Sequence, residues 1–475
     1  MDTQIWDFEQ FFDHIAVLDE HGNRMTYGEL SEENNHFVEK IKERSLIFIL
    51  CTNTIGSLIG YTGCIHNRIV PLLLPKNLNR ELLDSLIDVY KPDYLWIPKE
   101  LSLEFGDFSV EHEAFGYLLL ETGYKQEYVL HDELCLLLTT SGSTGSPKLV
   151  RQSYKNVLSN AQSIVQYLEL DALEKPITTL PMNYTYGLSI INSHLLAGAT
   201  LLFTEKGLMQ REFWQFFKEA AATSFGGVPY TYEMLDKLRF FKMELPSLRS
   251  MTQAGGKLQP ELHKKFAEYA MEKGKRFYVM YGQSEATARM SYLPYEKSLE
   301  KYGSMGIAIP GGNFTLIDET GRKIQEPETV GELVYQGPNV TLGYAECGED
   351  LKKGDERYGC LETGDMAWFD TDGYYYIAGR KKRFLKIFGN RVNLDEVERM
   401  IKGDFEGMDC VSTGRDDRMY VFVEGGALQE EIRSFLSEKT GLNPSAFVVK
   451  SIPMIPRNSS GKILYKDLEM YMKEP

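Results

Sequence analysis

The residues best suited to binding phosphate lie between positions 134 and 151, which read LCLLLTTSGSTGSPKLVR. Residues 134–138 are apolar, as in a buried strand, and lead into hydroxyls and glycines that end at Lys148. Bare backbone N–H groups, hydroxyl donors and a cation are what hold a polyphosphate in a loop. This is not a Walker A loop, because no lysine directly follows Gly145 and Leu149 replaces the required Ser or Thr. A flexible Gly/Ser linker is the alternative, which the preceding strand and the lysine disfavour.

Four more motifs with groups suited to a nucleotide follow along the chain. The first, Tyr281-Gly282-Gln283-Ser284-Glu285, offers a ring to stack on a base, a hydroxyl for a phosphate and a carboxylate for Mg²⁺. The others are residues 362–365 (ETGD), 379–386 (GRKKRFLK) and 456–462 (PRNSSGK). Taken singly they have plainer interpretations: a strand-end turn, a common tripeptide, a solvated basic face or nucleic-acid patch, and a surface lysine. Five motifs in order are stronger evidence than any one of them.

Length and composition indicate a globular protein of two or more domains. The chain has 475 residues, of which 43% are hydrophobic and 25% are charged. Its net charge of −16 argues against a general nucleic-acid binder. An anionic ligand must therefore be met by cations that are gathered locally.

The spacing of the cysteines and the lack of long apolar runs in the sequence predict a cytoplasmic protein. No apolar run reaches the length of a membrane span, and residues 1–10 carry acids without the basic start of a secretory leader. The scattered cysteines form no C-x-x-C pair, which indicates free thiols in a reducing compartment and no metal site. These are Cys51, Cys64, Cys135, Cys347, Cys360 and Cys410.

The hydrophobic pattern predicts strands that alternate with helices in the first part of the chain. Such alternation is typical of a parallel, doubly wound sheet. Ser153 is a plausible N-cap for a following helix. From about residue 303 to 377, glycines and short β-like runs predict a compact β unit, and a last α+β module follows, with a helix capped by Asn393 and Glu396. Strands are expected at 46–50, 70–75, 94–97 and 277–281, and helices at 55–66, 80–90 and 188–196, whereas residues 105–131 carry no clear pattern.

These five motifs together resemble the adenylate-forming superfamily, which contains acyl- and aryl-CoA synthetases, adenylation domains of peptide synthetases, and luciferases. The resemblance extends from residues 26–30 (TYGEL) to Gly461-Lys462 and is closest to the acyl- or aryl-CoA synthetases. It implies an α/β fold. Residues 1–381 would form a large N-terminal domain of doubly wound α/β subdomains plus a small β-barrel-like subdomain, and residues 382–475 a small, mobile α+β domain.

The resemblance also implies how the motifs would hold ATP and Mg²⁺. The phosphate loop would wrap the departing phosphates, Tyr281 would stack on adenine, and Glu285 would hold the metal. Asp365 and Arg380 would reach the ribose, Lys382 would be the hinge, and the region of Gly389 and Arg391 would meet the thiol substrate. The remaining nucleotide contacts would come from Thr140, Ser141, Gly142, Ser143, Thr144, Gly145, Gly255, Gly256, Lys257 and Gly282.

Catalysis would rest on charge, with Lys462 as the catalytic lysine and Ser284, Glu285 and Lys148 around the phosphates. In and directly after the five motifs, three positions depart from the family pattern. Ser284 replaces the usual Thr but keeps the hydroxyl, Asn458 stands where Thr is usual, and Tyr465 stands where Arg often follows. The last two leave Lys462 intact.

The implied reaction joins a small carboxylic acid to ATP and then to a pantetheine thiol. Members that activate amino acids have an aspartate near the position of Thr185, so an α-amino acid is disfavoured here. Tyr184, Tyr186, Phe225 and Tyr230 are expected to line an acyl pocket, although aromatic residues at such spacing are more often core. The thiol could belong to CoA or to the phosphopantetheine of an acyl carrier protein.

Two other classes of function remain open at this point. A phosphotransferase using the Gly/Ser loop would release ADP, whereas an adenylating enzyme releases AMP and pyrophosphate. A non-catalytic nucleotide-binding relative would be expected to have lost Lys462, Glu285 or Asp365, and all three are present.

Overall fold

The computed structural model describes residues 4–124, 128–139, 148–387, 390–405, 407–415, 417–425, 428–457 and 463–472. Of Lys382, Phe384, Lys386, Asn390, Arg391 and Asn393 it describes the backbone. The described residues group into two compact units. The first contains residues up to 139, 148–314 and 335–361, and the second contains 315–334 and those from 362 onward. The domain boundary expected at residues 381 and 382 stays a prediction.

An eight-stranded sheet of the first unit carries the stretch from which the phosphate loop leaves. Its order is β20-β9-β8-β4-β3-β5-β7-β6, and the pairs β3–β4, β3–β5 and β4–β8 are parallel. The strands are β3 (Leu46–Cys51), β4 (Val70–Pro75), β5 (Tyr94–Pro98), β6 (Ser109–Ala114), β7 (Tyr117–Glu121), β8 (Leu134–Thr139), β9 (Leu149–Ser153) and β20 (Gly343–Ala345). The weakly patterned residues 105–131 thus supply β7 and the edge strand β6.

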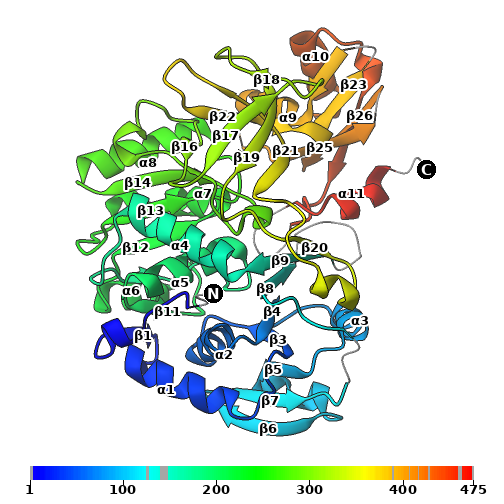
Figure 1. The fold of residues 1–475 in the computed structure, drawn as a ribbon. Coiled ribbons are helices and arrows are strands. Elements are labelled where there is room, and N and C mark those ends of the chain that lie inside the picture. Colours follow the sequence, from blue (N-terminus) through cyan, green and yellow to red (C-terminus); the bar gives the residue numbers. More distant parts are fainter. Residues whose placement is uncertain are drawn as a thin grey trace. The chain divides into compact units, whose positions relative to one another are not determined.

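Helices cover both faces of this sheet, as a doubly wound arrangement requires (Figure 1). Side chains of β3 alternate: Ile47 and Ile49 join one hydrophobic cluster with α2 (Ile55–His66), whereas Leu46 and Phe48 join another with α3 (Arg80–Tyr90). Small residues let α2 approach closely. A Cβ at Gly60 would lie 2.4 Å from the Trp96 ring, so a larger residue there would push the helix away.

A second sheet of the first unit has nine strands and carries the other nucleotide motif. Its order is β16-β15-β14-β13-β12-β10-β11-β1-β2, parallel from β1 to β14 and antiparallel at both edges. The strands are β1 (Ile15–Asp19), β2 (Arg24–Thr26), β10 (Pro176–Ile177), β11 (Leu201–Phe203), β12 (Ser224–Gly227), β13 (Ser250–Gln253), β14 (Arg276–Tyr281), β15 (Ser291–Tyr292) and β16 (Ile307–Ala308). Both large sheets are mixed, and the expected parallel strands form their centres.

Capping residues fix where the helices of this unit begin. The Thr26 hydroxyl accepts a hydrogen bond from the Glu29 N–H while the Glu29 carboxylate accepts one from the Thr26 N–H. Ser153 caps α4 in the same way, which confirms the expected N-cap. The helices are α1 (Tyr27–Val38), α4 (Tyr154–Leu168), α5 (Thr185–Leu196), α6 (Arg211–Glu219), α7 (Pro229–Lys237) and α8 (Pro260–Glu272), so α5 starts one turn earlier than expected.

The compact β unit expected near residues 303–377 is an open five-stranded sheet and no closed barrel within the described residues. Its order is β18-β17-β19-β21-β22. The strands are β17 (Asn313–Ile317), β18 (Lys323–Ile324), β19 (Gly331–Gln336), β21 (Cys360–Phe369) and β22 (Tyr375–Arg380). The ends of this sheet are β18 and β22, which do not pair with each other.

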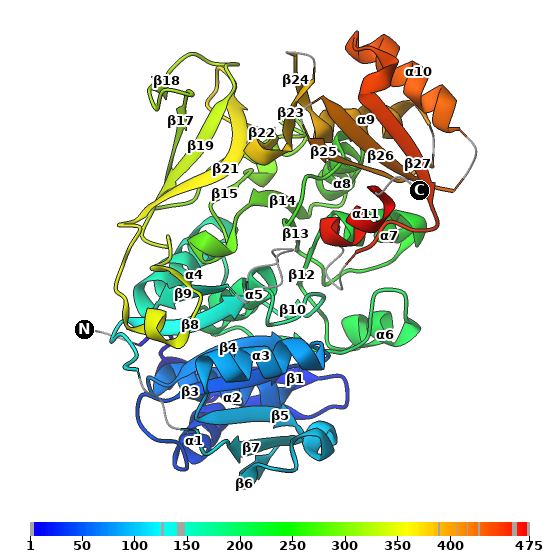
Figure 2. The ribbon, with the colours of Figure 1, turned by 90° about the vertical axis from the view of Figure 1, so that its right-hand side faces the viewer.

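The chain ends in the α+β module that the sequence predicted (Figure 2). Three strands, in the order β25-β26-β27, carry the apolar side chains on which α9 and α10 pack. The module contains β23 (Phe384–Ile387), β24 (Asn390–Asn393), α9 (Leu394–Asp404), β25 (Cys410–Arg415), β26 (Arg418–Glu424), α10 (Gln429–Thr440), β27 (Phe447–Ile452) and α11 (Tyr465–Met472). The side chain of Asn393, the expected cap of α9, lies outside the described residues. None of the described helices is both long enough and apolar enough to cross a membrane.

Candidate functional site

The phosphate loop connects two paired strands, β8 and β9. Thr139 is opposite Leu149 in the antiparallel register, so the loop leaves and re-enters the sheet at neighbouring positions. The six loop residues expected to contact phosphate, Thr140 to Gly145, lie outside the described residues. Lys148 is described: its Nζ lies 3.4 Å from a Glu346 carboxylate oxygen and 3.9 Å from the centroid of the Tyr344 ring.

The motif Tyr281-Gly282-Gln283-Ser284-Glu285 begins at the end of β14. Only glycine fits at position 282, because a Cβ there would lie 1.6 Å from the Ala288 carbonyl oxygen. Ser284 and Glu285 form a single 3₁₀ turn that ends at Ala286. The Glu285 side chain therefore lies beside β20, and the segment is not a plain surface turn.

Glu285 is held from both its side chain and its main chain. The Tyr344 hydroxyl donates a hydrogen bond of 2.7 Å to Glu285 Oε1. The Glu285 carbonyl accepts hydrogen bonds from the Thr341 N–H at 3.0 Å and from Arg357 Nη1 at 2.9 Å. Burial, and then the Glu285 carboxylate, raise the pKa of Tyr344 to about 12, so its hydroxyl keeps its proton and remains a donor at neutral pH.

The turn Gly255-Gly256-Lys257, expected to contact the nucleotide, lies against Tyr184. Gly255 has φ +82°, and a Cβ there would lie 2.5 Å from the Tyr184 hydroxyl oxygen. Gln253 Nε2 donates a hydrogen bond of 2.9 Å to the Gly256 carbonyl and so stabilises the turn. Lys257 follows on the exposed side. The turn therefore leaves no room for a side chain between itself and Tyr184.

In the second unit, the two residues expected at the ribose face each other. Asp365 on β21 is opposite Arg380 on β22, and Arg380 Nε lies 3.5 Å from Asp365 Oδ1. The Asp365 side chain is 6% exposed and that of Arg380 is 70% exposed. The guanidinium is thus accessible to a ligand, whereas the carboxylate is buried beside it. The side chains of Lys382 and Arg391, and the whole of Gly389 and Lys462, lie outside the described residues.

The structure brings together two of the four residues expected to line the acyl pocket. The rings of Tyr184 and Tyr186 are 6.3 Å apart, and the Tyr186 hydroxyl is 2.8 Å from the Thr252 carbonyl oxygen. Phe225 packs instead against Tyr232 and Phe240 in the core. Its neighbour Gly226 faces Tyr186, and successive residues of a strand point to opposite faces. Tyr230 is 51% exposed in the first turn of α7.

A buried arginine that the sequence reasoning missed lies behind these tyrosines. Arg289 is 1% exposed, and its Cζ lies 5.0 Å from the centroid of the Tyr186 ring. Its hydrogen bonds go to neutral groups, the hydroxyls of Ser189 at 3.1 Å and Tyr167 at 3.0 Å. Within the described part of the chain, no ion pair joins Arg289 to a carboxylate.

Tyr344 and Arg357 are further functional candidates that the motifs did not reveal. The Arg357 guanidinium lies 4.5 Å from the centroid of the Tyr344 ring. The only local signal is an aromatic residue after a glycine in residues 343–344, and that pattern is common. The contacts with Glu285 and Lys148 depend on three separate segments meeting in space.

A single carboxylate is sufficient for the metal expected here. The described residues contain no group of three or more His, Cys, Asp or Glu that could enclose an ion. Mg²⁺ is usually bound through one or two carboxylates together with waters and substrate phosphates. Glu285, next to the expected phosphate site, fits that chemistry.

Comparison with known proteins agrees with this fold and these motifs. Residues 6–345 match the AMP-binding enzyme family, and the chain belongs to that family. It is 32% identical to an oxalate–CoA ligase of Arabidopsis thaliana, over 71% of this chain and 67% of the relative, and a second plant ligase, peroxisomal OPC-8:0-CoA ligase 1, is matched over 65% of its length. It is 28% identical to a 2-succinylbenzoate–CoA ligase of Bacillus mycoides, over 91% of this chain and 90% of the relative.

Solved structures share the fold along the whole chain. ATP-bound MatB from Rhodopseudomonas palustris superposes with a TM-score of 0.79 at 21% identity, covering 99% of each chain. An o-succinylbenzoate CoA synthetase (MenE) from Bacillus subtilis, in complex with AMP, superposes with a TM-score of 0.77 at 20% identity, covering 97% of this chain and 96% of that one.

Proposed function

We propose that this protein is an AMP-forming acid–thiol ligase that activates a small carboxylic acid and transfers it to CoA. In the first step RCOO⁻ and ATP give RCO-AMP and pyrophosphate. In the second, a thiol displaces AMP to give the thioester, and the thiol proton is lost to solvent. The observation that carries the proposal is the meeting of Glu285 and Lys148 at Tyr344, within a chain of the AMP-binding enzyme family.

The first step needs positive charge more than it needs a base. The attacking carboxylate is already ionised, and the barrier comes from bringing it against a triphosphate. Lys148 and the loop N–H groups would stabilise the departing phosphates, and Lys462 would bridge the carboxylate and the α-phosphate. Removing one such charge typically costs on the order of 10²-fold in rate.

Magnesium would supply Lewis-acid charge on the phosphate oxygens when bound, held by Glu285. The Ser284 hydroxyl would bond the α-phosphate and Tyr281 would stack on adenine. Asp365 and Arg380, which already face each other, would hold the ribose hydroxyls. These roles, with those of Gly255, Gly256, Lys257 and Gly282 beside the base, form part of the proposal.

The acid we propose is small or aromatic, and it is not an α-amino acid. Thr185, near the position where amino-acid-activating members carry an aspartate, donates its hydroxyl to the Thr287 carbonyl at 2.7 Å. A buried substrate ammonium would have no counter-charge from this side chain. Tyr184 and Tyr186 would contact the acyl group.

A second carboxylate on the acid is favoured by Arg289. A buried guanidinium among neutral acceptors lacks the counter-charge that usually accompanies it. Oxalate and 2-succinylbenzoate, the acids in the names of two relatives, each carry two carboxylates. We therefore propose dicarboxylic acids as the first substrates to try.

Pyrophosphate release from a panel of acids tests this function. The panel pairs monocarboxylic and dicarboxylic acids of equal length, each run with CoA, with an acyl carrier protein, and with neither. Acid-dependent formation of AMP and pyrophosphate, with a thioester seen by mass spectrometry, supports the proposal, and the productive acceptor identifies the thiol. A thioester on the carrier protein alone would favour a stand-alone loading enzyme. Release of ADP or inorganic phosphate would instead indicate a phosphotransferase, and no acid-dependent product would indicate a non-catalytic relative.

A further inference from the structure

We propose that Tyr344 is a positioning residue that sets Glu285 and Lys148 at a fixed separation before ATP arrives. The ion pair of Arg151 with Glu356 would fix the segment that carries Tyr344. The inference rests on the proposed function, because there Glu285 meets Mg²⁺ and Lys148 meets the phosphates. It concerns this chain's own side chains, all of which lie in the first unit.

Tyr344 contacts three charged groups from three separate segments. Its hydroxyl donates to Glu285 Oε1 at 2.7 Å, and two cations lie over its ring, Lys148 Nζ at 3.9 Å and the Arg357 guanidinium at 4.5 Å. Cations over a tyrosine face are attracted by the ring quadrupole. One side chain thus contacts the expected metal ligand and the expected phosphate ligand at once.

Tyr344 also stands between two opposite charges that would otherwise attract each other. Lys148 lies against the face of the ring, and Glu285 is held at the hydroxyl end. Lys148 already pairs with Glu346, whose carboxylate oxygen lies 3.4 Å from Lys148 Nζ. Without the ring, Lys148 would be able to pair with Glu285 as well, and this second pair would have to open before ATP or Mg²⁺ could bind. Preorganised charges are effective because they need no such rearrangement.

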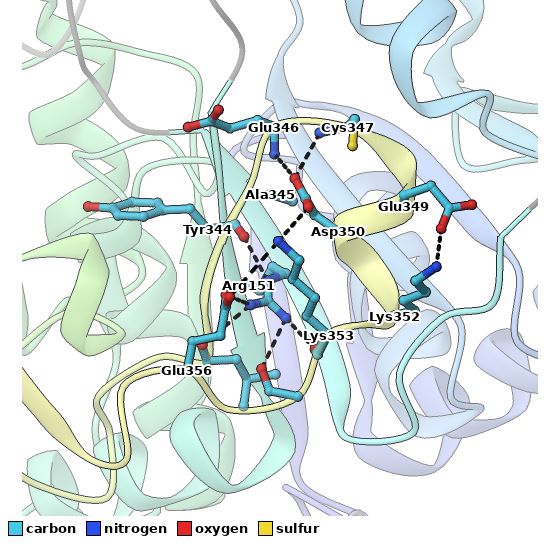
Figure 3. A network of polar contacts seen from close by, with 12 residues as sticks. Arg151, Tyr344, Ala345, Glu346, Cys347, Glu349, Asp350, Lys352, Lys353 and Glu356 are labelled. Carbon is cyan, nitrogen blue, oxygen red and sulfur yellow. Dashed lines mark hydrogen bonds and ion pairs between the residues drawn. The ribbon is translucent and has the colours of Figure 1, made fainter.

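Arg151 fixes the backbone on both sides of Tyr344 (Figure 3). Its guanidinium is fully buried and donates to the Tyr344 carbonyl at 2.9 Å and to the Leu342 carbonyl at 3.4 Å. It also donates to the carbonyls of Lys353 and Gly354 and pairs with the Glu356 carboxylate. The five donors of one planar side chain therefore join β9 to residues 342–356.

A close approach of the backbone makes this anchoring possible. Gly343 is opposite Arg151 in the antiparallel pairing of β9 and β20. A Cβ at Gly343 would lie 2.7 Å from a Glu356 carboxylate oxygen and 2.9 Å from Arg151 Nη2. Because residue 343 is a glycine, the Arg151–Glu356 ion pair has room directly beside Tyr344.

ATP binding measured by calorimetry, without acid substrate and with or without Mg²⁺, tests the inference. In Tyr344→Phe the ring remains but the hydrogen bond to the carboxylate is lost. We expect the Kd for ATP to rise about tenfold in the presence of Mg²⁺, the size typical of a hydrogen bond to a charged group, and to change less than about twofold in its absence. Glu356→Gln, which loosens the Arg151 anchor, should shift the Kd in the same direction by less.

Tyr61→Phe is the matched control. The Tyr61 hydroxyl is also buried and donates to a side chain, Asn192 Oδ1, at 2.8 Å, and neither residue contacts Glu285. This variant should bind ATP as the wild type does under both conditions. Two outcomes in Tyr344→Phe would overturn this inference and leave the proposed function standing: an unchanged Kd for ATP in the presence of Mg²⁺, or an equal rise of that Kd with and without Mg²⁺. A wild-type protein that binds no ATP would overturn the proposed function itself.

Discussion

At the scale of single residues, the least expected feature is the buried charge of Arg289. We predict that Arg289→Met, which keeps much of the volume and removes the charge, lowers kcat/KM for a dicarboxylic acid at least tenfold relative to the monocarboxylic acid of equal length. A charge-assisted hydrogen bond contributes about that much. The measurement is pyrophosphate release with both acids.

A surface arginine provides the control for Arg289. Arg249 is half exposed and pairs with the acidic side chains of Asp171 and Glu174. Arg249→Met should leave the ratio of the two kcat/KM values unchanged, because the contacts of Arg249 go to Asp171 and Glu174 and not to the tyrosines of the expected acyl pocket. An unchanged ratio in Arg289→Met as well would mean that the guanidinium has a structural role only.

At the scale of elements, the turn after β14 is the most constrained. We predict that Gly282→Ala lowers the free energy of unfolding by about 3 kcal/mol or more and weakens ATP binding, because the added Cβ would lie 1.6 Å from the Ala288 carbonyl oxygen. Backbone must move to relieve that contact, and Ser284 and Glu285 move with it. Urea unfolding and calorimetry measure the two effects.

Gly106 is the matched glycine for that experiment. It has φ −61°, and a Cβ there would contact nothing within 4 Å. Gly106→Ala should therefore be neutral, or more stable by up to about 1 kcal/mol through the unfolded chain. Equal stability of the Gly282 and Gly106 variants would show that the turn relaxes without cost.

At the scale of the whole molecule, two buried histidines make stability depend on pH. The His263 Nδ1 accepts the Gly303 N–H, and His194 Nδ1 lies 2.8 Å from the Ile190 carbonyl oxygen. Burial lowers the pKa of each to about 4. Both are thus neutral in the folded protein near pH 5, whereas in the unfolded chain they bind protons below about pH 6.5.

The free energy of unfolding should therefore fall as the pH drops from about 6.5 to 4, and these two groups should have no effect above that window. The unfolded state binds more protons inside the window, and each histidine contributes on the order of 3 kcal/mol across it. Urea unfolding between pH 4.5 and 7.5 measures the slope, and His263→Gln should reduce it by the contribution of one histidine. An unaltered slope in that variant would contradict the assignment.

In the proposed reaction the two steps would depend on different parts of the chain, because Lys462 belongs to the C-terminal part. We predict that Lys462→Ala abolishes adenylate formation and spares thioester formation from a supplied acyl-adenylate, since the family resemblance implies that the small domain would turn about Lys382 and withdraw this lysine between the steps. Pyrophosphate release and thioester formation are measured separately. Equal loss of both would contradict the role of Lys462.

The sequence by itself predicted the α/β class, the central strands, the cap of α4 and the motifs that place the chain among adenylate-forming enzymes. Those features are local: apolar runs, caps and glycine turns are set by residues close together in the chain. The strands β6 and β7 were missed because β6 has no buried side chain and the apolar run of β7, Tyr117 to Leu120, is short.

Tertiary structure alone decided what surrounds the motifs. Tyr344 meets Glu285 because β20 pairs with β9, on which Arg151 lies, and no local pattern encodes such a pairing. No local pattern showed either that the Phe225 side chain, on β12, packs in the core and not in the expected acyl pocket. The motifs thus predicted which groups would act on ATP, and packing between distant segments determined which side chains surround those groups.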